Sequence, residues 1–228
     1  MTSDAPSVSV EALRFRYGPA AFELILDALS IARGEKQVLI GPSGSGKSTF
    51  LHLVAGILLP AAGRVRVEGV DWSERNEAER RRFRISRLGL IFQEFELLEH
   101  LSLRENILLP FLLERTLPLS GEVEERLVAM ASRMGLAALL QRRPDQLSHG
   151  ERQRVAICRA LITEPALILA DEPTGNLDPR TTAEVLELLL GEVDRRGTTL
   201  LMVTHDQGLV GAFDRVIDFG APVAGARA

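Results

Sequence analysis

A glycine-rich stretch, GPSGSGKS at residues 41–48, restricts the fold of this chain more than any other feature. It fits the pattern G-x-x-x-x-G-K-S, it follows the apolar run at residues 37–40, and it precedes a predicted helix. Backbone N–H groups of such a loop can approach phosphate oxygens closely, because glycines carry no side chain. The stretch therefore predicts a phosphate-binding loop (P-loop) between a strand and a helix.

Two residues of this loop carry its chemistry. The Lys47 ammonium is expected to reach the β- and γ-phosphates, and the Ser48 hydroxyl can ligate Mg²⁺. Of the 27 basic residues only Lys36 and Lys47 are lysines, which favours a site that needs a compact ammonium rather than a guanidinium. Chance retention of a lysine is the alternative.

Three unbroken apolar runs, at residues 37–40, 166–170 and 199–204, predict buried parallel strands covered by helices on both faces. Polar or glycine-rich residues follow each run at once: GPSGSGKST, DEPTGNLD and HD. Ligands of open α/β sheets bind beyond the carboxyl ends of the strands, so we expect these three clusters to converge.

Other patterns frame this sheet. Segments 8–17 and 22–31, joined by a turn at Gly18-Pro19, predict an antiparallel flank. Apolar residues at helical spacing predict a helix over residues 122–134 that stops at Gly135. A second helix is expected over residues 151–161, behind a capping box of Ser148 and Glu151. We therefore predict one domain, residues 1–228, with a core around the P-loop at 1–92 and 160–228 and a helical subdomain at 93–159.

Four polar residues at predicted strand ends are candidates for catalysis. Asp171 and Glu172 are adjacent, so their side chains diverge, and we expect Asp171 to hold Mg²⁺ while Glu172 orients or deprotonates an attacking water. His205 follows the third run and could hydrogen-bond the γ-phosphate. Gln93 closes the strand-like LGLIFQ and could reach Mg²⁺ and the water. A surface acidic turn and ordinary polar strand ends are the alternatives.

Composition narrows the class of protein. One cysteine excludes an internal disulfide and fits a reducing compartment. A net charge of −4 argues mildly against bulk nucleic-acid binding. The first residues lack the pattern of a signal peptide, so export is not expected. The most apolar segment, residues 50–62, contains His52 and Pro60 and is shorter than a membrane span, so a membrane role would depend on a partner.

The order of these motifs resembles one family over nearly the whole chain. QLSHGERQR at 146–154, the pair Asp171-Glu172, the run NLD at 176–178 and His205, all after a P-loop, are similar to the ATP-binding cassette (ABC) ATPases. The resemblance implies an α/β P-loop NTPase (RecA-like) fold: a mostly parallel sheet core, an N-terminal antiparallel β flank and an inserted α-helical subdomain. It also implies hydrolysis of ATP with Mg²⁺.

In this family two chains form a head-to-tail homodimer around two ATP molecules, and the signature helix of each chain faces the γ-phosphate held by the other. The resemblance assigns the aromatic ring on adenine to Tyr17, or failing that to Phe15. It assigns the Mg²⁺ ligands to Ser48, Gln93 and Asp171. The other nucleotide contacts that it implies are Gly41, Ser43, Gly44, Ser45, Gly46, Lys47, Thr49, Ser148, Gly150, Glu151 and Asp178.

LADEPTGNLD and LRENILLP resemble the branch that powers lipoprotein release and macrolide-type export. This implies a transmembrane permease that contacts the region after Gln93 and a location on the inner face of the cell membrane, in the cytoplasm. Phe95, Leu97, Leu98 and Leu101 could form a groove for a partner helix, or simply pack inside the subdomain. The six arginines at 75–87 interleave with glutamates, as on a solvated helix, so no nucleic-acid partner is expected.

His149 departs from the family's usual L-S-G-G-E, and we expect His149→Gly to change ATP turnover by less than about tenfold, since a β-carbon is tolerable at the first helical position. Three other functions stay open: a cassette ATPase in cell division or on nucleic acid, a P-loop kinase, and a scaffold without catalysis. A kinase has no use for the signature helix or the NLD run.

Overall fold

The computed structural model describes residues 5–18 and 22–220, which fall into two compact units. Unit 1 comprises Met1–Arg84 and Thr198–Ala228, and unit 2 comprises Ile85–Gly197. Unit 2 contains the predicted helical section together with two strands and a long helix. The subdomain boundaries at residues 93 and 159 stay a prediction.

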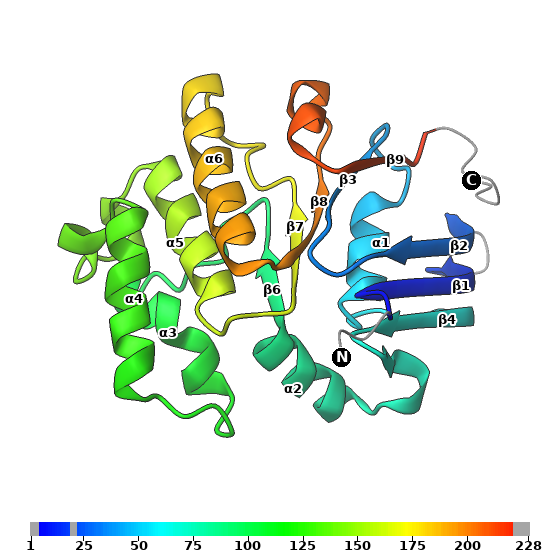
Figure 1. Cartoon of the computed structure of the whole chain (residues 1–228), viewed down its shortest axis with the longest axis horizontal. Helices are drawn as coiled ribbons and strands as arrows, with labels where there is room; N and C mark the ends of the chain where they lie inside the picture. Colours follow the sequence, from blue (N-terminus) through cyan, green and yellow to red (C-terminus); the bar gives the residue numbers. More distant parts are fainter. Residues whose placement is uncertain (1–4, 19–21, 221–228) are drawn as a thin grey trace. The chain divides into compact units, whose positions relative to one another are not determined.

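An antiparallel sheet forms the first layer of unit 1. Its strands lie in the order β2 (Glu23–Ile31), β1 (Val8–Arg16), β4 (Ala62–Val67) and β5 (Val70–Asp71), and Figure 1 shows the first three side by side. Val8 pairs with Ile31 on one side and with Val67 on the other. The predicted antiparallel flank is thus confirmed, while Pro19 of the predicted turn lies outside the described residues.

Parallel strands form the second layer of unit 1. β3 (Lys36–Ile40) lies between β8 (Thr199–Val203) and β9 (Arg215–Asp218) and is parallel to both. All of β8 is buried, which explains why its sequence is an unbroken apolar run. Helix α1 (Lys47–Val54) follows the P-loop, and two short 3-10 helices, at Trp72–Glu74 and Gln207–Ala212, complete the unit.

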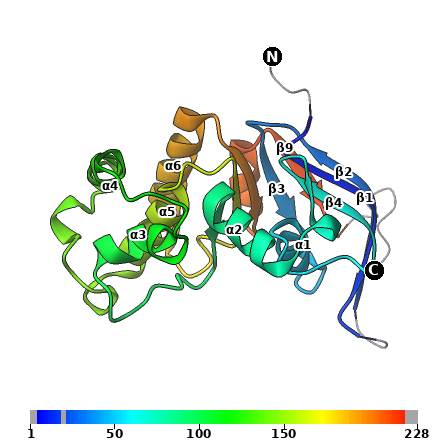
Figure 2. The same ribbon diagram turned by 90° about the horizontal axis from the view of Figure 1, so that it is seen from below.

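Unit 2 is mostly helical. Its strands β6 (Leu88–Ile91) and β7 (Leu167–Asp171) are parallel. Helix α5 contacts α3, α4 and α6, and Figures 1 and 2 show it lying beside α6. The bounds are α3 Leu103–Leu113, α4 Gly121–Arg133, α5 His149–Leu161 and α6 Pro179–Arg196, with 3-10 turns at Ala137–Leu139 and Pro144–Gln146. The two predicted helices are confirmed, and Gly135 (φ +67°) follows α4 as the expected stop.

Helix α2 (Glu77–Arg87) carries most of the arginine-rich segment. Arg80 and Arg84 both donate to the carbonyl oxygen of Gly56, at 3.1 and 2.9 Å, and both pair with Glu77 at 2.7 Å. These contacts fix α2 to the end of α1. They support the interpretation of this arginine run as a helix surface.

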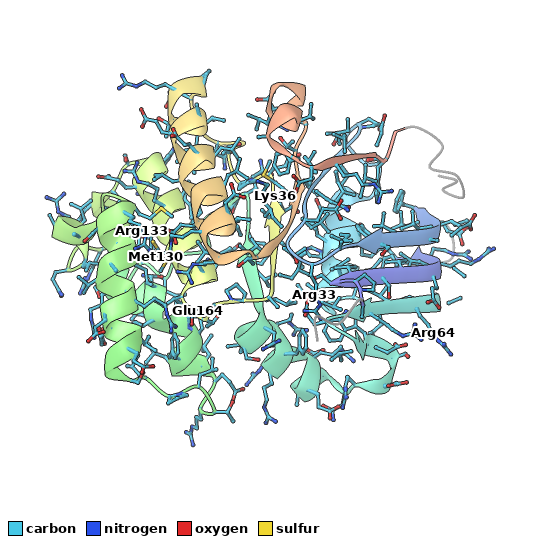
Figure 3. All side chains as sticks on the ribbon, viewed as in Figure 1. Arg33, Lys36, Arg64, Met130, Arg133 and Glu164 are labelled. Atoms are coloured by element: carbon cyan, nitrogen blue, oxygen red, sulfur yellow. The ribbon has the colours of Figure 1, made fainter. Side chains whose placement is uncertain are left out.

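Helices α4 and α6 are joined by an ion-pair cluster around Glu192, which is only 4% exposed. Arg133 and Arg195 each lie 2.5 Å from its carboxylate, and Arg196 lies 3.4 Å away. Arg196 also approaches Glu164 at 3.6 Å; Figure 3 labels Met130, Arg133 and Glu164 of this region. Burial would raise the pKa of Glu192, but hydrogen bonds from Arg133 and Arg195 outweigh it and lower that pKa to about 2.

Cys158 lies in the core of unit 2 on α5 and is fully buried. Burial, with a smaller contribution from the Glu192 charge, raises the pKa of its thiol to about 12. The thiol is therefore protonated at neutral pH.

Candidate functional site

The P-loop connects β3 to α1, as predicted. Gly46 caps α1 in the left-handed conformation (φ +92°), and a Cβ there would stand 2.6 Å from Cζ of Phe22. Gly44 is also left-handed (φ +80°). Both the backbone angle and the close approach of Phe22 therefore require glycine at position 46.

Lys47 is folded back over its own loop. Its Nζ donates to the carbonyl oxygens of Gly41 and Pro42, both at 2.8 Å, and lies 3.5 Å from Oγ of Ser45. The residue is only 7% exposed, whereas Ser43, Gly44 and Ser48 are exposed. The ammonium thus lies against the carbonyl oxygens at the start of the P-loop.

Tyr17 is attached to this loop. Its hydroxyl lies 3.2 Å from Oγ1 of Thr49, and its ring stands edge-on to Phe15 with 4.9 Å between centroids. Tyr17 is 59% exposed and Phe15 only 7%. Of the two aromatic candidates, Tyr17 is therefore the more accessible to a base.

His205 leaves the sheet at the same edge as the P-loop. Strands β3 and β8 pair in parallel, with Leu39 opposite Val203, and the Thr204 N–H donates to the Leu39 carbonyl at 3.1 Å. His205 is exposed directly after this pairing. Two of the three predicted clusters are therefore neighbours within unit 1.

The other catalytic candidates meet in unit 2. Asp171 ends β7, and Glu172 follows in a left-handed conformation (φ +44°) that is costly for a residue with a side chain. A Cβ at Gly175 would stand 3.4 Å from both Nε2 of Gln93 and Oε2 of Glu172. Asn176 donates from Nδ2 to the Gln93 carbonyl at 3.2 Å. Gln93 and Glu172 therefore border the same small space.

The capping box at the start of α5 is confirmed. The Ser148 hydroxyl accepts from the Glu151 N–H at 3.3 Å, while the Glu151 carboxylate accepts from the Ser148 N–H at 2.8 Å. The bond from the Ser148 N–H, followed by a bond from the Ser148 hydroxyl at 2.8 Å, lowers the pKa of the Glu151 carboxyl. The Glu151 side chain is therefore turned back onto the helix end, and its expected contact with nucleotide stays a prediction.

Helix α6 begins beside this helix end. Asp178 caps it by accepting from the N–H groups of Arg180 and Thr181, and the Thr181 hydroxyl donates to Asp178 at 2.6 Å. The hydroxyl bond from Thr181, followed by the backbone bonds, lowers the pKa of Asp178. Its contact with nucleotide likewise stays a prediction.

A pocket of about 530 Å³ lies between the starts of α5 and α6. Its polar lining includes Ser148, His149, Arg154, Asn176, Asp178 and Thr181. The N–H groups at the start of a helix favour an anion. The pocket therefore brings the N-terminus of α5 together with the NLD run.

Sequence analysis missed three residues that shape these sites: Phe22 against Gly46, Thr181 against Gly150, and Arg159, which donates to the carbonyl of Phe95 at 2.8 Å. Only Thr181 had a local signal, since it lies three residues after the capping Asp178. The predicted convergence of the P-loop and His205 of unit 1 with the DEPTGNLD cluster of unit 2 stays a prediction.

The expected Mg²⁺ ligands are a hydroxyl (Ser48), an amide (Gln93) and a carboxylate (Asp171). All three offer oxygen, which is the donor that Mg²⁺ prefers. Among residues 5–18 and 22–220 no three His, Cys, Asp or Glu side chains gather as a metal cluster. A site with one carboxylate that is completed by phosphate oxygens fits this chemistry.

No helix in the described part of the chain is long and apolar enough to cross a membrane.

Comparison with known proteins identifies relatives of most of the chain. The family model described as ABC transporter matches residues 27–175. The lipoprotein-releasing system ATP-binding protein LolD of Legionella pneumophila is 43% identical over 83% of this chain and 82% of its own length. LolD of Hydrogenovibrio crunogenus is 46% identical over 79% and 78%. The ABC transporter ATP-binding protein YtrE of Bacillus subtilis is 44% identical over 78% and 77%.

Solved structures agree. The dimeric ATP-binding cassette MJ0796, in a post-hydrolysis state bound to ADP and Pi, matches with a TM-score of 0.82 and 32% identity over 93% of this chain and 95% of that one. The cbiO1 subunit of the Clostridium perfringens cbiONQ transporter complex matches with a TM-score of 0.82 and 29% identity over 95% and 86%. The predicted α/β P-loop NTPase fold is confirmed.

Proposed function

The chain belongs to the ABC transporter family as an ATP-hydrolysing, nucleotide-binding subunit of the LolD branch, and we propose that it closes as a head-to-tail dimer over two ATP molecules to drive a lipoprotein-releasing membrane partner. The relatives carry transporter names, and this favours transport over a role in cell division or on nucleic acid. A membrane partner places the subunit in the cytoplasm, on the inner face of the membrane.

One observation supports the dimer above all. The N-terminus of α5, with Ser148 and Gly150, borders a pocket of about 530 Å³ that residues of unit 2 line. The phosphate-binding loop and the signature helix are then two half-sites, and each needs its counterpart from a second chain. A two-fold axis satisfies both at once. The dimeric state of the similar cassette is in keeping with this arrangement.

In this proposal unit 1 binds the phosphates and the adenine of ATP, and residues of both units hold Mg²⁺. The amides of the P-loop and the Lys47 ammonium hold the β- and γ-phosphates, and Lys47 exchanges its bonds to the Gly41 and Pro42 carbonyls for phosphate oxygens. Tyr17 offers its exposed ring to adenine. Ser48, Gln93 and Asp171 would hold Mg²⁺, which neutralises phosphate charge when it is bound.

In this proposal, side chains that follow the ends of strands carry out hydrolysis. The Glu172 carboxylate orients a water and takes one of its protons, the water oxygen bonds to the γ-phosphorus, and the bond from that phosphorus to the β,γ-bridging oxygen breaks so that ADP leaves. The Gln93 amide borders the same space as Glu172 and orients the same water. His205 hydrogen-bonds the γ-phosphate.

The partner contacts the loop after Gln93. Leu98 is 37% exposed there, while Phe95, Leu97 and Leu101 are half-buried. Glu94, Glu96 and Glu99 are exposed around them. An apolar surface with an acidic rim fits an amphipathic helix that carries basic residues. Bulk nucleic-acid binding is not expected at a net charge of −4.

Glu172→Gln tests the proposal, because it keeps the shape of the side chain but removes the base. With ATP and Mg²⁺ this variant is expected to elute from a sizing column at twice the 25.0 kDa mass of the chain, and with ADP at the single mass. Glu172→Gln combined with Lys47→Ala should stay monomeric. A Glu172→Gln chain that remains monomeric at every ATP concentration, beside a wild type whose specific activity is independent of dilution, would contradict it.

A further inference from the structure

Side chains of two helices fasten the loop between β6 and α3. From α5, the Arg159 guanidinium donates to the carbonyl oxygens of Phe95 (2.8 Å) and Glu96. From α3, the buried Asn106 accepts from the Leu98 N–H at 2.8 Å and donates to the Leu98 carbonyl at 3.1 Å. Residues 95–98 are thereby held without regular backbone pairing.

A third contact reaches the same loop from the start of α5. The imidazole of His149 packs on the ring of Phe95, with 5.8 Å between centroids and 46° between planes, within the range in which aromatic rings attract each other. His149 is the first residue of α5, directly between Ser148 and Gly150. Arg159 lies ten residues further along the same helix, so α5 holds Phe95 from two points.

We propose that His149 is a positioning residue that, together with Arg159, couples the partner-binding loop to the nucleotide-facing end of α5. The inference rests on the proposed function for what each surface binds. A displacement of Phe95 by a partner moves the helix end through His149, and closure of that end on ATP fixes Phe95 in turn. The glycine usual at this signature position has no side chain with which to make this contact.

Hydrogen–deuterium exchange of the full chain without nucleotide tests the contact itself. His149→Ala and Phe95→Leu should each raise the exchange rates of amides 94–97 at least fivefold. The double variant should raise these rates no further, because the two substitutions remove the same ring contact. His149→Phe keeps a ring on Phe95 and should stay within twofold of wild type. Amides of α4 serve as the internal reference and should not change.

A second measurement tests the coupling in the Glu172→Gln background. ATP with Mg²⁺ should protect amides 94–97 at least fivefold, His149→Ala should abolish this protection, and His149→Phe should restore it. In the measurement without nucleotide, the inference would be overturned if the increases in exchange rate of the two single variants multiply in the double variant. In the measurement with ATP, it would be overturned if His149→Phe behaves like His149→Ala, and this result would assign His149 to direct phosphate contact. Because the first measurement uses no nucleotide, a failure of ATP-driven dimerisation alone would remove the proposed function and leave the contact standing.

Discussion

The methyl carbon of Thr181 lies 2.6 Å from the point where a Cβ at Gly150 would stand. Thr181 cannot turn this methyl away, because its hydroxyl is fixed to the carboxylate of Asp178 at 2.6 Å. The packing of α5 on α6 therefore favours glycine at position 150, in addition to any contact with nucleotide.

This relationship predicts a rescue. Gly150→Ala should destabilise the chain by about 1 kcal/mol, since overpacking costs roughly 1–3 kcal/mol and the better helix propensity of alanine offsets only part of it. Thr181→Ser deletes the methyl but keeps the hydroxyl bond to Asp178, and in combination it should restore stability to within about 0.5 kcal/mol of the single Thr181→Ser chain. Urea unfolding of the four chains measures this. If the free-energy costs of the two substitutions simply add, the methyl of Thr181 is not what opposes alanine at position 150.

The positive φ of Glu172 predicts that glycine is favoured there on stability grounds. A left-handed backbone costs a residue with a side chain roughly 1–2 kcal/mol, so Glu172→Gly should be about 1 kcal/mol more stable than Glu172→Ala by urea unfolding. At the exposed Glu187 of α6 the order should invert, because glycine is about 1 kcal/mol worse than alanine inside a helix. Both variants at position 172 should lose ATP hydrolysis. Equal stabilities of the two would mean that the loop stores no strain at this position.

The exposed ring of Tyr17 predicts that the ring contributes more to ATP binding than the hydroxyl does. Tyr17→Ala should weaken binding of a fluorescent ATP analogue about tenfold, since stacking on a base is worth roughly 1–3 kcal/mol. Tyr17→Phe loses only the hydroxyl contact with Thr49 and should stay within about threefold. An affinity that is unchanged in Tyr17→Ala would place the adenine elsewhere.

The lowered pKa of Glu192 predicts that the stability of the chain falls at low pH. Its folded pKa of about 2 lies below the ordinary value of 4.5, so its contribution is complete above pH 4.5 and is lost as the pH falls toward 2. Glu192→Gln should cost about 3 kcal/mol at pH 7, since it removes the buried carboxylate that Arg196, only 10% exposed, and two half-exposed arginines share. The difference from wild type should shrink between pH 4.5 and pH 2.

The matched control is Glu184→Gln on the same helix. Glu184 pairs with Arg180 at 3.1 Å, but the pair is exposed. Its loss should cost less than about 1 kcal/mol at any pH. Equal pH profiles of the two variants would show that burial does not set the behaviour of Glu192.

Much of this architecture could be predicted because its signals are local. The P-loop, the capping box of α5 and the apolar runs of β3, β7 and β8 depend on residues within a few positions of one another. Contacts between distant segments have no such signal: nothing around residue 150 reveals that Thr181 packs there, and nothing around Phe95 reveals Arg159. Helix α6 did carry unused signals, a capping Asp178, Pro179 and Gly197 at its end. The convergence of the P-loop and His205 of unit 1 with the DEPTGNLD cluster of unit 2 stays a prediction, because it depends on how both units and a second chain assemble.

Cys158 gives this chain a practical property. A thiol that is protonated at neutral pH and closed off from solvent should ignore maleimide reagents and mild oxidants while the protein is folded. Spectroscopic probes attached to a cysteine engineered at an exposed position would then report from that position alone. Opening and closing of the assembly could be followed in the native background, without first replacing the natural thiol.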